Sequence, residues 1–122
     1  MLPETRHIIN ASRLAAMKQT AYLINVSRGP LIDSVALAHE LANNGIAGAA
    51  VDVLEEEPPP IDDPLLSAPR MILSNHVAWY SEESERRLRD LLSDRCAAVL
   101  VREPASSVVN AAGLQALAVS AE

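Results

Sequence analysis

Short apolar runs alternate along the chain with stretches that have a helical period. Three of these runs have the length of a strand: residues 21–26 (AYLINV), 46–53 (IAGAAVDV) and 71–74 (MILS). The first is nearly all apolar, which is typical of a strand covered on both faces, as in a parallel sheet. We predict strands at all three positions, the first two of them buried.

A helix is predicted between the first two strands. Leu37 and Leu41 lie four residues apart and share one face of a helix at residues 34–43. Asp33 is its N-cap. Asn44-Gly45 is the stop signal, because glycine tolerates the left-handed conformation that ends many helices.

Two further helices flank the strands. A short helix at residues 11–18 begins after the N-cap Asn10 and presents Leu14 inward. Ser81 caps a long helix at residues 82–101, and Pro104 ends it. The apolar stripe of this long helix consists of Leu88, Leu91, Leu92, Cys96 and Val99.

The order of these elements is that of half a doubly wound α/β domain. A strand, a helix and a second strand form a βαβ unit, whose crossover should be right-handed. Residues 54–69 are expected to be irregular, because several prolines interrupt them. The four glycines form no Gly-x-Gly-x-x-Gly pattern, so the half that carries a phosphate-binding loop is not represented.

Composition narrows the classes of protein that the chain can represent. Its 122 residues suffice for one small domain, and 49% apolar residues allow a packed core. A net charge of −6 argues against a nucleic-acid or anionic-membrane partner. No apolar run reaches the roughly 20 residues of a transmembrane helix. We therefore expect a cytoplasmic protein without membrane partners.

A single cysteine, Cys96, excludes an internal disulfide and a site built from several thiolates. Because it lies in the predicted long helix, we expect a buried structural thiol rather than a nucleophile. We expect no metal site.

Three polar side chains follow the ends of the predicted strands. Arg28, Glu57 and His76 each come after one apolar run. Ligands of open α/β sheets bind at the carboxyl ends of the strands. An arginine, a carboxylate and a histidine there suggest a site that binds an anionic substrate and transfers a proton. Glu55 and Glu56 are interpreted as a solvated acidic loop, and the histidines outside this pattern, His7 and His39, as surface residues.

Three motifs resemble one family in the same order. They are residues 25–33 (NVSRGPLID), residues 50–58 (AVDVLEEEP) and residues 72–79 (ILSNHVAW), and they resemble its N-x-x-R-G-x-x-x-D, D-V-x-x-x-E-P and T-P-H-x-A segments. The family is the D-isomer-specific 2-hydroxyacid dehydrogenases, which include D-3-phosphoglycerate dehydrogenase and hydroxypyruvate reductase. Residues 76–82 look most like the C-terminal binding protein branch, whose members also act as corepressors.

The resemblance implies a catalytic role for three residues. Arg28 would bind the carboxylate of a 2-keto acid and polarise its keto group. His76 would be the general acid/base, for which the ordinary histidine pKa of about 6.5 is suited. Glu57 would be the partner carboxylate of His76.

The resemblance also implies contacts with a cofactor. Val26, Ser27, Arg28, Asp52 and His76 would line the nicotinamide pocket of NAD, with NADP not excluded. Asp52 would hydrogen-bond the carboxamide, or alternatively cap the loop after its strand. Trp79 would stand near the substrate, or serve as a core or interface anchor.

The implied fold is the second half of a doubly wound, Rossmann-type parallel sheet, with about three strands and flanking helices. Residues 1–103 would be a partial NAD-binding domain, and residues 104–122 a poorly ordered tail. Family members are usually dimers and more than twice this length, so the chain would be the catalytic half of a dehydrogenase.

Two alternatives remain open at this point. A non-catalytic, NAD(H)-sensing binding protein of the corepressor type would keep the site and work through partners. An inactive truncated product would expose the unpaired edge of the strand at residues 21–26, and would self-associate or be poorly soluble.

Overall fold

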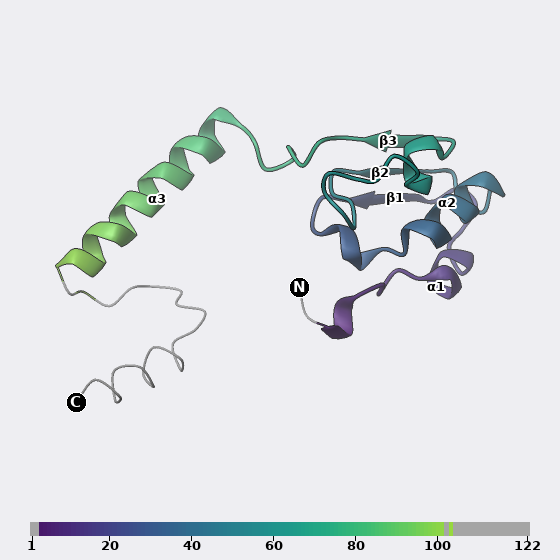
Figure 1. The fold of residues 1–122 in the computed structure, drawn as a ribbon, viewed down its shortest axis with the longest axis horizontal. Coiled ribbons are helices and arrows are strands. Elements are labelled where there is room, and N and C mark those ends of the chain that lie inside the picture. Colours follow the sequence, from purple (N-terminus) through teal and green to yellow (C-terminus); the bar gives the residue numbers. More distant parts are fainter. Residues whose placement is uncertain (1–2, 102, 104–122) are drawn as a thin grey trace. The chain divides into compact units, whose positions relative to one another are not determined.

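The chain divides into two units, Met1–Trp79 and Tyr80–Glu122. The computed structural model describes residues 3–101 and residue 103. The first unit contains a three-stranded sheet with helices, and the described part of the second contains the long helix α3 (Glu82–Leu100) (Figure 1). The tail predicted at residues 104–122 lies outside the described residues.

The sheet is parallel throughout, with the strands in the order β1-β2-β3. These strands are β1 (Tyr22–Asn25), β2 (Gly48–Val51) and β3 (Met71–Leu73). Each lies within a predicted run, so the three predicted strands and their parallel pairing are confirmed. The irregular stretch between β2 and β3 contains one short 3-10 turn, η3 (Pro64–Ser67).

Side chains cap the helices where the sequence predicted. Helix α1 (Ala11–Ala15) follows Asn10, whose side chain accepts from the Arg13 amide at 3.2 Å. Helix α2 (Ser34–Ala42) follows Asp33, and α3 follows Ser81, each capping in the same way. Helix α1 ends before the predicted residue 18. The Met17 amide donates to the Leu14 carbonyl and the Ala21 amide to the Lys18 carbonyl, so turns leading into β1 replace the last predicted turn of the helix.

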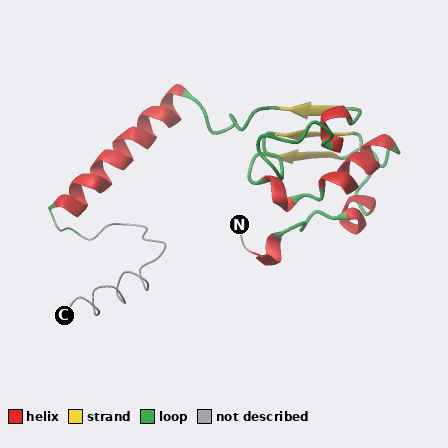
Figure 2. Cartoon of the chain, viewed as in Figure 1, coloured by secondary structure: helices red, strands yellow, loops and turns green. Residues whose placement is uncertain are grey.

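The core of the first unit lies on one side of the sheet. Its fully buried side chains are those of Leu14, Leu37, Leu41 and Ile46. Helix α2 packs against α1 and η3, and both α1 and α2 lie on the same side of the sheet (Figure 2). The helical period of the sequence therefore identified the inward-facing leucines correctly.

The opposite face of the sheet is open, which corrects the prediction of strands covered on both faces. Tyr22 and Ile24 of β1 are 72% and 69% exposed, and Ile72 of β3 is 70% exposed. In a strand, alternate side chains point to opposite faces, so these residues share the face away from α1 and α2. No described helix of the first unit covers this face.

The stop of α2 differs in one residue from the prediction. Asn44, not Gly45, adopts the left-handed conformation, with a φ of 57°. Asparagine tolerates this conformation better than most residues. The Gly45 amide then donates to the carbonyl of Glu40 at 2.8 Å.

Helix α3 is amphipathic, but its apolar stripe is exposed. Leu88, Leu92 and Val99 are exposed, and none of the described side chains of α3 is buried. Cys96 is exposed too, so the prediction of a buried thiol is wrong. A helical period shows which residues share a face, and it does not show that the face is covered. No helix within the described ranges is long and apolar enough to cross a bilayer.

Removing a core leucine from α2 should destabilise the first unit. We expect Leu41→Ala to lower the free energy of unfolding by about 2–5 kcal/mol, because the deleted methyl groups leave a cavity. Val35 lies on the same helix and is 68% exposed, so Val35→Ala is the matched control and should cost less than about 0.5 kcal/mol. Urea denaturation of both variants measures the difference, and equal losses would contradict this description of the core.

Candidate active site

Three loops meet at the carboxyl edge of the sheet, one after each strand. Two backbone hydrogen bonds hold them together at this edge. The Asp52 amide after β2 donates to the Asn25 carbonyl of β1 at 2.9 Å, and the His76 amide after β3 donates to the Asp52 carbonyl at 2.8 Å. This edge is where open α/β sheets bind ligands.

The carboxylate of Asp52 organises the loop after β3. Asp52 is only 4% exposed. One of its oxygens accepts from the Ser74 hydroxyl at 2.5 Å and from the Val77 amide at 2.9 Å. The other accepts from the Ala78 amide at 2.9 Å. A side chain directly after β2 thereby fixes both ends of the turn that carries His76.

Hydrogen bonding keeps Asp52 ionised. The Ser74 hydroxyl contributes most to lowering the pKa of this carboxyl. The Ala78 and Val77 amides and the nearby charge of His76 lower the pKa further, against the opposing effect of burial. A buried charge is costly unless hydrogen bonds compensate it, and here three of them do.

His76 has a left-handed backbone conformation, with a φ of 53°. This conformation is uncommon outside glycine and persists only where the surroundings fix it. The Asp52 contacts to residues on both sides of His76 provide that constraint. The turn places Nδ1 of His76 at 2.7 Å from Oε2 of Glu57.

The Glu57 carboxylate has two partners. Oε2 meets His76, and Oε1 accepts from the Leu54 amide at 3.0 Å. These two hydrogen bonds, that of His76 first, lower the pKa of Glu57, and the charge of His76 adds to their effect. Burial and the charge of Asp52 oppose this shift. The side chains of His76 and Glu57 are 45% and 40% exposed, so the pair is open to solvent.

Arg28 lies on the loop after β1, and its guanidinium is exposed. Nη1 donates to the Ser27 carbonyl at 2.7 Å. Asn25 shapes this loop, since its side chain accepts from the Ser27 amide and donates to the Arg28 carbonyl. The structure therefore brings Glu57 and His76 into contact and leaves Arg28 on the neighbouring loop, with no ion pair to either among the described residues.

Gly29 brings the Arg28 loop against the loop that carries Glu57. A Cβ at position 29 would lie 1.8 Å from the Leu54 carbonyl oxygen, and that contact is with backbone. Only glycine permits this approach. Sequence reasoning missed the roles of Asn25 and Gly29. The signal was available, because both belong to the segment NVSRG at the end of an apolar run.

A cavity of about 180 Å³ opens beside the Glu57–His76 pair. Its lining includes Asp52, Ser74 and Pro58. Val26 and Trp79, predicted as cofactor and substrate contacts, are exposed.

The interpretation of Glu55 as part of a solvated loop is wrong, whereas His7 keeps a 33% exposed side chain at the surface, in contact with Glu55. The Glu55 side chain is 23% exposed and forms ion pairs with Arg6 at 2.9 Å and His7 at 2.8 Å. Burial would raise the pKa of Glu55. The His7 hydrogen bond, the Ser34 amide and the charges of His7 and Arg6 outweigh burial and lower this pKa. Glu56 and His39 are exposed, as expected.

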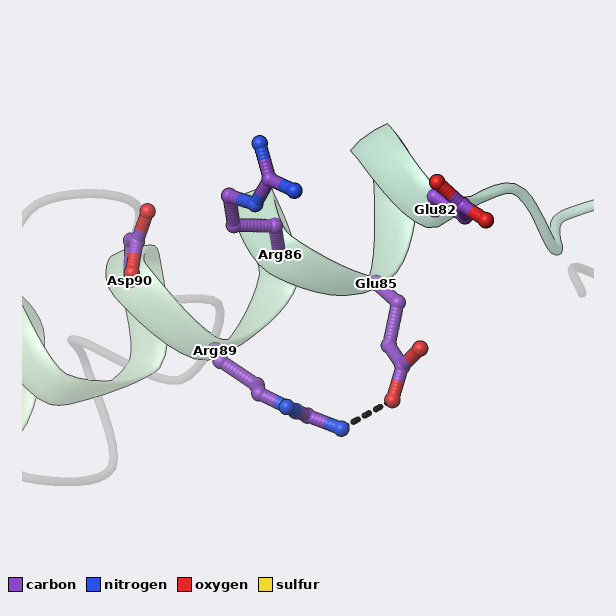
Figure 3. A pocket seen from close by; sticks show the side chains of 5 residues that line it. All are labelled: Glu82, Glu85, Arg86, Arg89 and Asp90. Carbon is purple, nitrogen blue, oxygen red and sulfur yellow. Dashed lines mark hydrogen bonds and ion pairs between the residues drawn. The ribbon is translucent and has the colours of Figure 1, made fainter.

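A second hollow lies along α3, and only charged side chains of this helix line it. Figure 3 shows its five lining side chains, all from this one helix. Arg89 pairs with Glu85 one turn away, which is ordinary for an exposed helix. No group of three or more potential metal ligands is present among the described residues.

The motif, the fold and the edge geometry agree with comparisons to known proteins. The model for the "D-isomer specific 2-hydroxyacid dehydrogenase, NAD binding domain" matches residues 1–78. The chain belongs to this family. It is 44% identical over 107 residues to a glyoxylate reductase of Thermofilum pendens, covering 88% of this chain and 32% of that protein.

Solved structures of the family share the fold. A D-lactate dehydrogenase from Treponema pallidum superimposes with a TM-score of 0.80 at 35% identity, over 88% of this chain and 36% of that one. A D-lactate dehydrogenase with NAD+ from Lactobacillus jensenii gives 0.78 at 30% identity, over 90% and 37%. The chain thus spans about a third of the length of the relatives it matches.

The Glu57–His76 contact predicts a measurable titration. We expect the carboxyl of Glu57 to titrate below its ordinary range, and His76→Ala to return the pKa towards that range. A folded-state pKa below the unfolded one stabilises the protein above the unfolded pKa, and this stability is lost as the pH falls through the folded pKa. Carboxyl ¹³C NMR measures the titration, with His39→Ala as the control. An unchanged Glu57 pKa in His76→Ala would refute the contact.

Asp52→Asn tests the turn directly. Asparagine has the same shape, but its NH₂ group replaces one carboxylate oxygen and can only donate hydrogen bonds. That NH₂ group would face a donor, either the Ala78 amide or the Ser74 hydroxyl and Val77 amide. We expect the unfolding midpoint to fall by roughly 5 °C or more, because at least one of the three donors loses its acceptor. Asp62 is exposed, so Asp62→Asn is the control and should leave the midpoint unchanged. Equal melting of the two variants would show that Asp52 does not hold the turn.

Proposed function

We propose that this chain is the catalytic part of an NAD-dependent D-2-hydroxyacid dehydrogenase. The reaction is hydride transfer between the nicotinamide cofactor and a 2-keto or 2-hydroxy acid. The observation that carries the proposal is the 2.7 Å contact between His76 and Glu57 at the carboxyl edge of the sheet, one loop away from Arg28. Family membership and the solved dehydrogenases of similar fold support it.

His76 is the proton donor for reduction in this proposal. Because an ionised carboxylate only accepts hydrogen bonds, Nδ1 of His76 carries the proton that points at Glu57. Nε2 is then the ring nitrogen that gives a proton to the carbonyl oxygen of the substrate, and takes one back in oxidation. Glu57 fixes the orientation of the ring and stabilises the imidazolium.

Arg28 binds the carboxylate of the substrate. Its guanidinium is exposed and carries a permanent charge, and it pairs with carboxylates through two parallel hydrogen bonds. The Asn25 side chain and the close approach at Gly29 hold the loop that presents it. Placement of the substrate carboxylate on Arg28 would direct the keto group of the substrate towards His76.

The residues at the edge fit the nicotinamide half of the cofactor. Asp52 uses three of the roughly four acceptor positions of a carboxylate, so one remains for a carboxamide N–H. Val26 and Ser27 are exposed at the end of β1 and are available to line the ring. The bound cofactor would supply or accept the hydride. Its pyrophosphate needs a glycine-rich loop that these 122 residues do not contain.

The substrate class is a small 2-keto acid, and the complete protein is expected to form a dimer. The cofactor proposed is NAD, after the name of the matching domain, with NADP as the alternative, since a related dehydrogenase was solved with NADPH.

Removing the imidazole should abolish turnover in the complete protein. We expect His76→Ala to lower kcat for reduction of 2-keto acids by about 10²–10⁴-fold, the usual contribution of a general acid. NADH binding, measured by fluorescence, should be largely retained. His39→Ala changes an exposed histidine outside the site and should leave kcat unchanged. Normal turnover by His76→Ala would refute the proposed role.

A further inference from the structure

We infer that Glu55 is a positioning residue for this reaction, because its carboxylate fixes the backbone that lies between Arg28 and Glu57. The inference rests on the proposed function above. It concerns a residue outside the Arg28, Glu57 and His76 set, and one that the sequence pattern placed in solvent.

One carboxylate joins three segments of the first unit. Oε2 of Glu55 accepts from Nη2 of Arg6 at 2.9 Å and meets Nε2 of His7 at 2.8 Å. Oε1 accepts from the backbone amide of Ser34 at 3.3 Å. Ser34 is the first residue of α2, so this contact also satisfies an amide that has no partner within the helix.

The partners of Glu55 are themselves fixed. The His7 amide donates to the Pro30 carbonyl at 2.8 Å, directly after the Arg28 loop. Ile9 forms a parallel bridge with Ile32, which ties the same N-terminal segment to the start of α2. His7 has a left-handed backbone, with a φ of 49°, a conformation that needs such support. The N-terminal segment that Glu55 contacts is therefore itself fixed by backbone hydrogen bonds to residues 30–32.

The backbone next to Glu55 contacts both sides of the site. On one side, the Leu54 carbonyl and the Glu55 amide pack against Gly29, the neighbour of Arg28. On the other side, the Leu54 amide donates to Oε1 of Glu57 at 3.0 Å. A shift of this peptide would alter the position of Arg28 and the orientation of the Glu57 carboxylate together.

The loop has little regular structure of its own to resist such a shift. Strand β2 ends at Val51, and no helix or strand begins before η3 at Pro64. Glu57 itself is exposed, so packing does not fix its side chain. The Glu55 contacts supply anchoring that the exposed end of the loop lacks.

Two variants each remove the ion pairs of Glu55, one by changing Glu55 and the other by changing its partners. Glu55→Gln keeps the size of the side chain and removes its charge. The double variant Arg6→Ala/His7→Ala keeps Glu55 and removes its two side-chain donors. Glu56→Gln is the matched control, since Glu56 is the exposed neighbour in the same acidic run. Unfolding curves of each variant show whether the fold is retained, and if one variant fails to fold the other gives the answer.

Two readouts are needed, and the first does not depend on activity. Carboxyl ¹³C NMR of the 122-residue chain should show the pKa of Glu57 rising towards its ordinary range in both test variants and not in Glu56→Gln. In the complete protein, kcat for a 2-keto acid should fall by about 10- to 100-fold, the effect of roughly 1 Å of misplacement, while the Kd of NADH stays unchanged.

The outcomes separate this inference from the proposed function. If both test variants lose stability but keep the Glu57 pKa and kcat of the wild type, Glu55 is only a structural anchor and the inference is wrong. If the complete wild-type protein turns over no 2-keto acid, the proposed function fails. In that case the Glu57 pKa in the two test variants is the one remaining readout, and it shows whether Glu55 sets the position of Glu57.

Discussion

The candidate site depends on one buried carboxylate. Asp52 directly follows β2 and accepts hydrogen bonds from Ser74, Val77 and Ala78, and so it holds the turn in which His76 has its left-handed conformation. Without that turn, Nδ1 of His76 would not meet Glu57. Burial makes the constraint strong, because a carboxylate that is only 4% exposed depends on these three donors for its solvation.

The rest of the edge is built by short-range contacts between loops. Asn25 shapes the Arg28 loop, Gly29 lets the next loop approach, and Glu55 ties that loop to the N-terminal segment. None of these residues carries out chemistry in the proposed mechanism. These loop contacts can keep the side chains of Glu57 and His76 in position relative to each other, even though both are exposed and no core surrounds them.

The sequence predicted what depends on periodicity and missed what depends on tertiary contacts. Apolar runs located the three strands, and the leucines of α2 located the core. The open face at Tyr22 and the exposed Cys96 were missed, because a pattern shows that a face is apolar and not what covers it. Glu55 was interpreted as solvated because its partners, Arg6 and His7, lie 49 and 48 residues away in sequence. The pairing of Glu57 with His76 followed from the family motifs rather than from spacing.

Amide hydrogen exchange at Val77 and Ala78, measured as protection factors across pH, tests the central constraint most directly. Asp52 accepts from both amides, and its pKa lies below the ordinary range. We predict clear protection of both amides at neutral pH. This protection should persist as the pH falls through the ordinary carboxyl range and be lost only when Asp52 takes up a proton. Unprotected amides at neutral pH, or protection that disappears at an ordinary carboxyl pKa, would contradict this prediction.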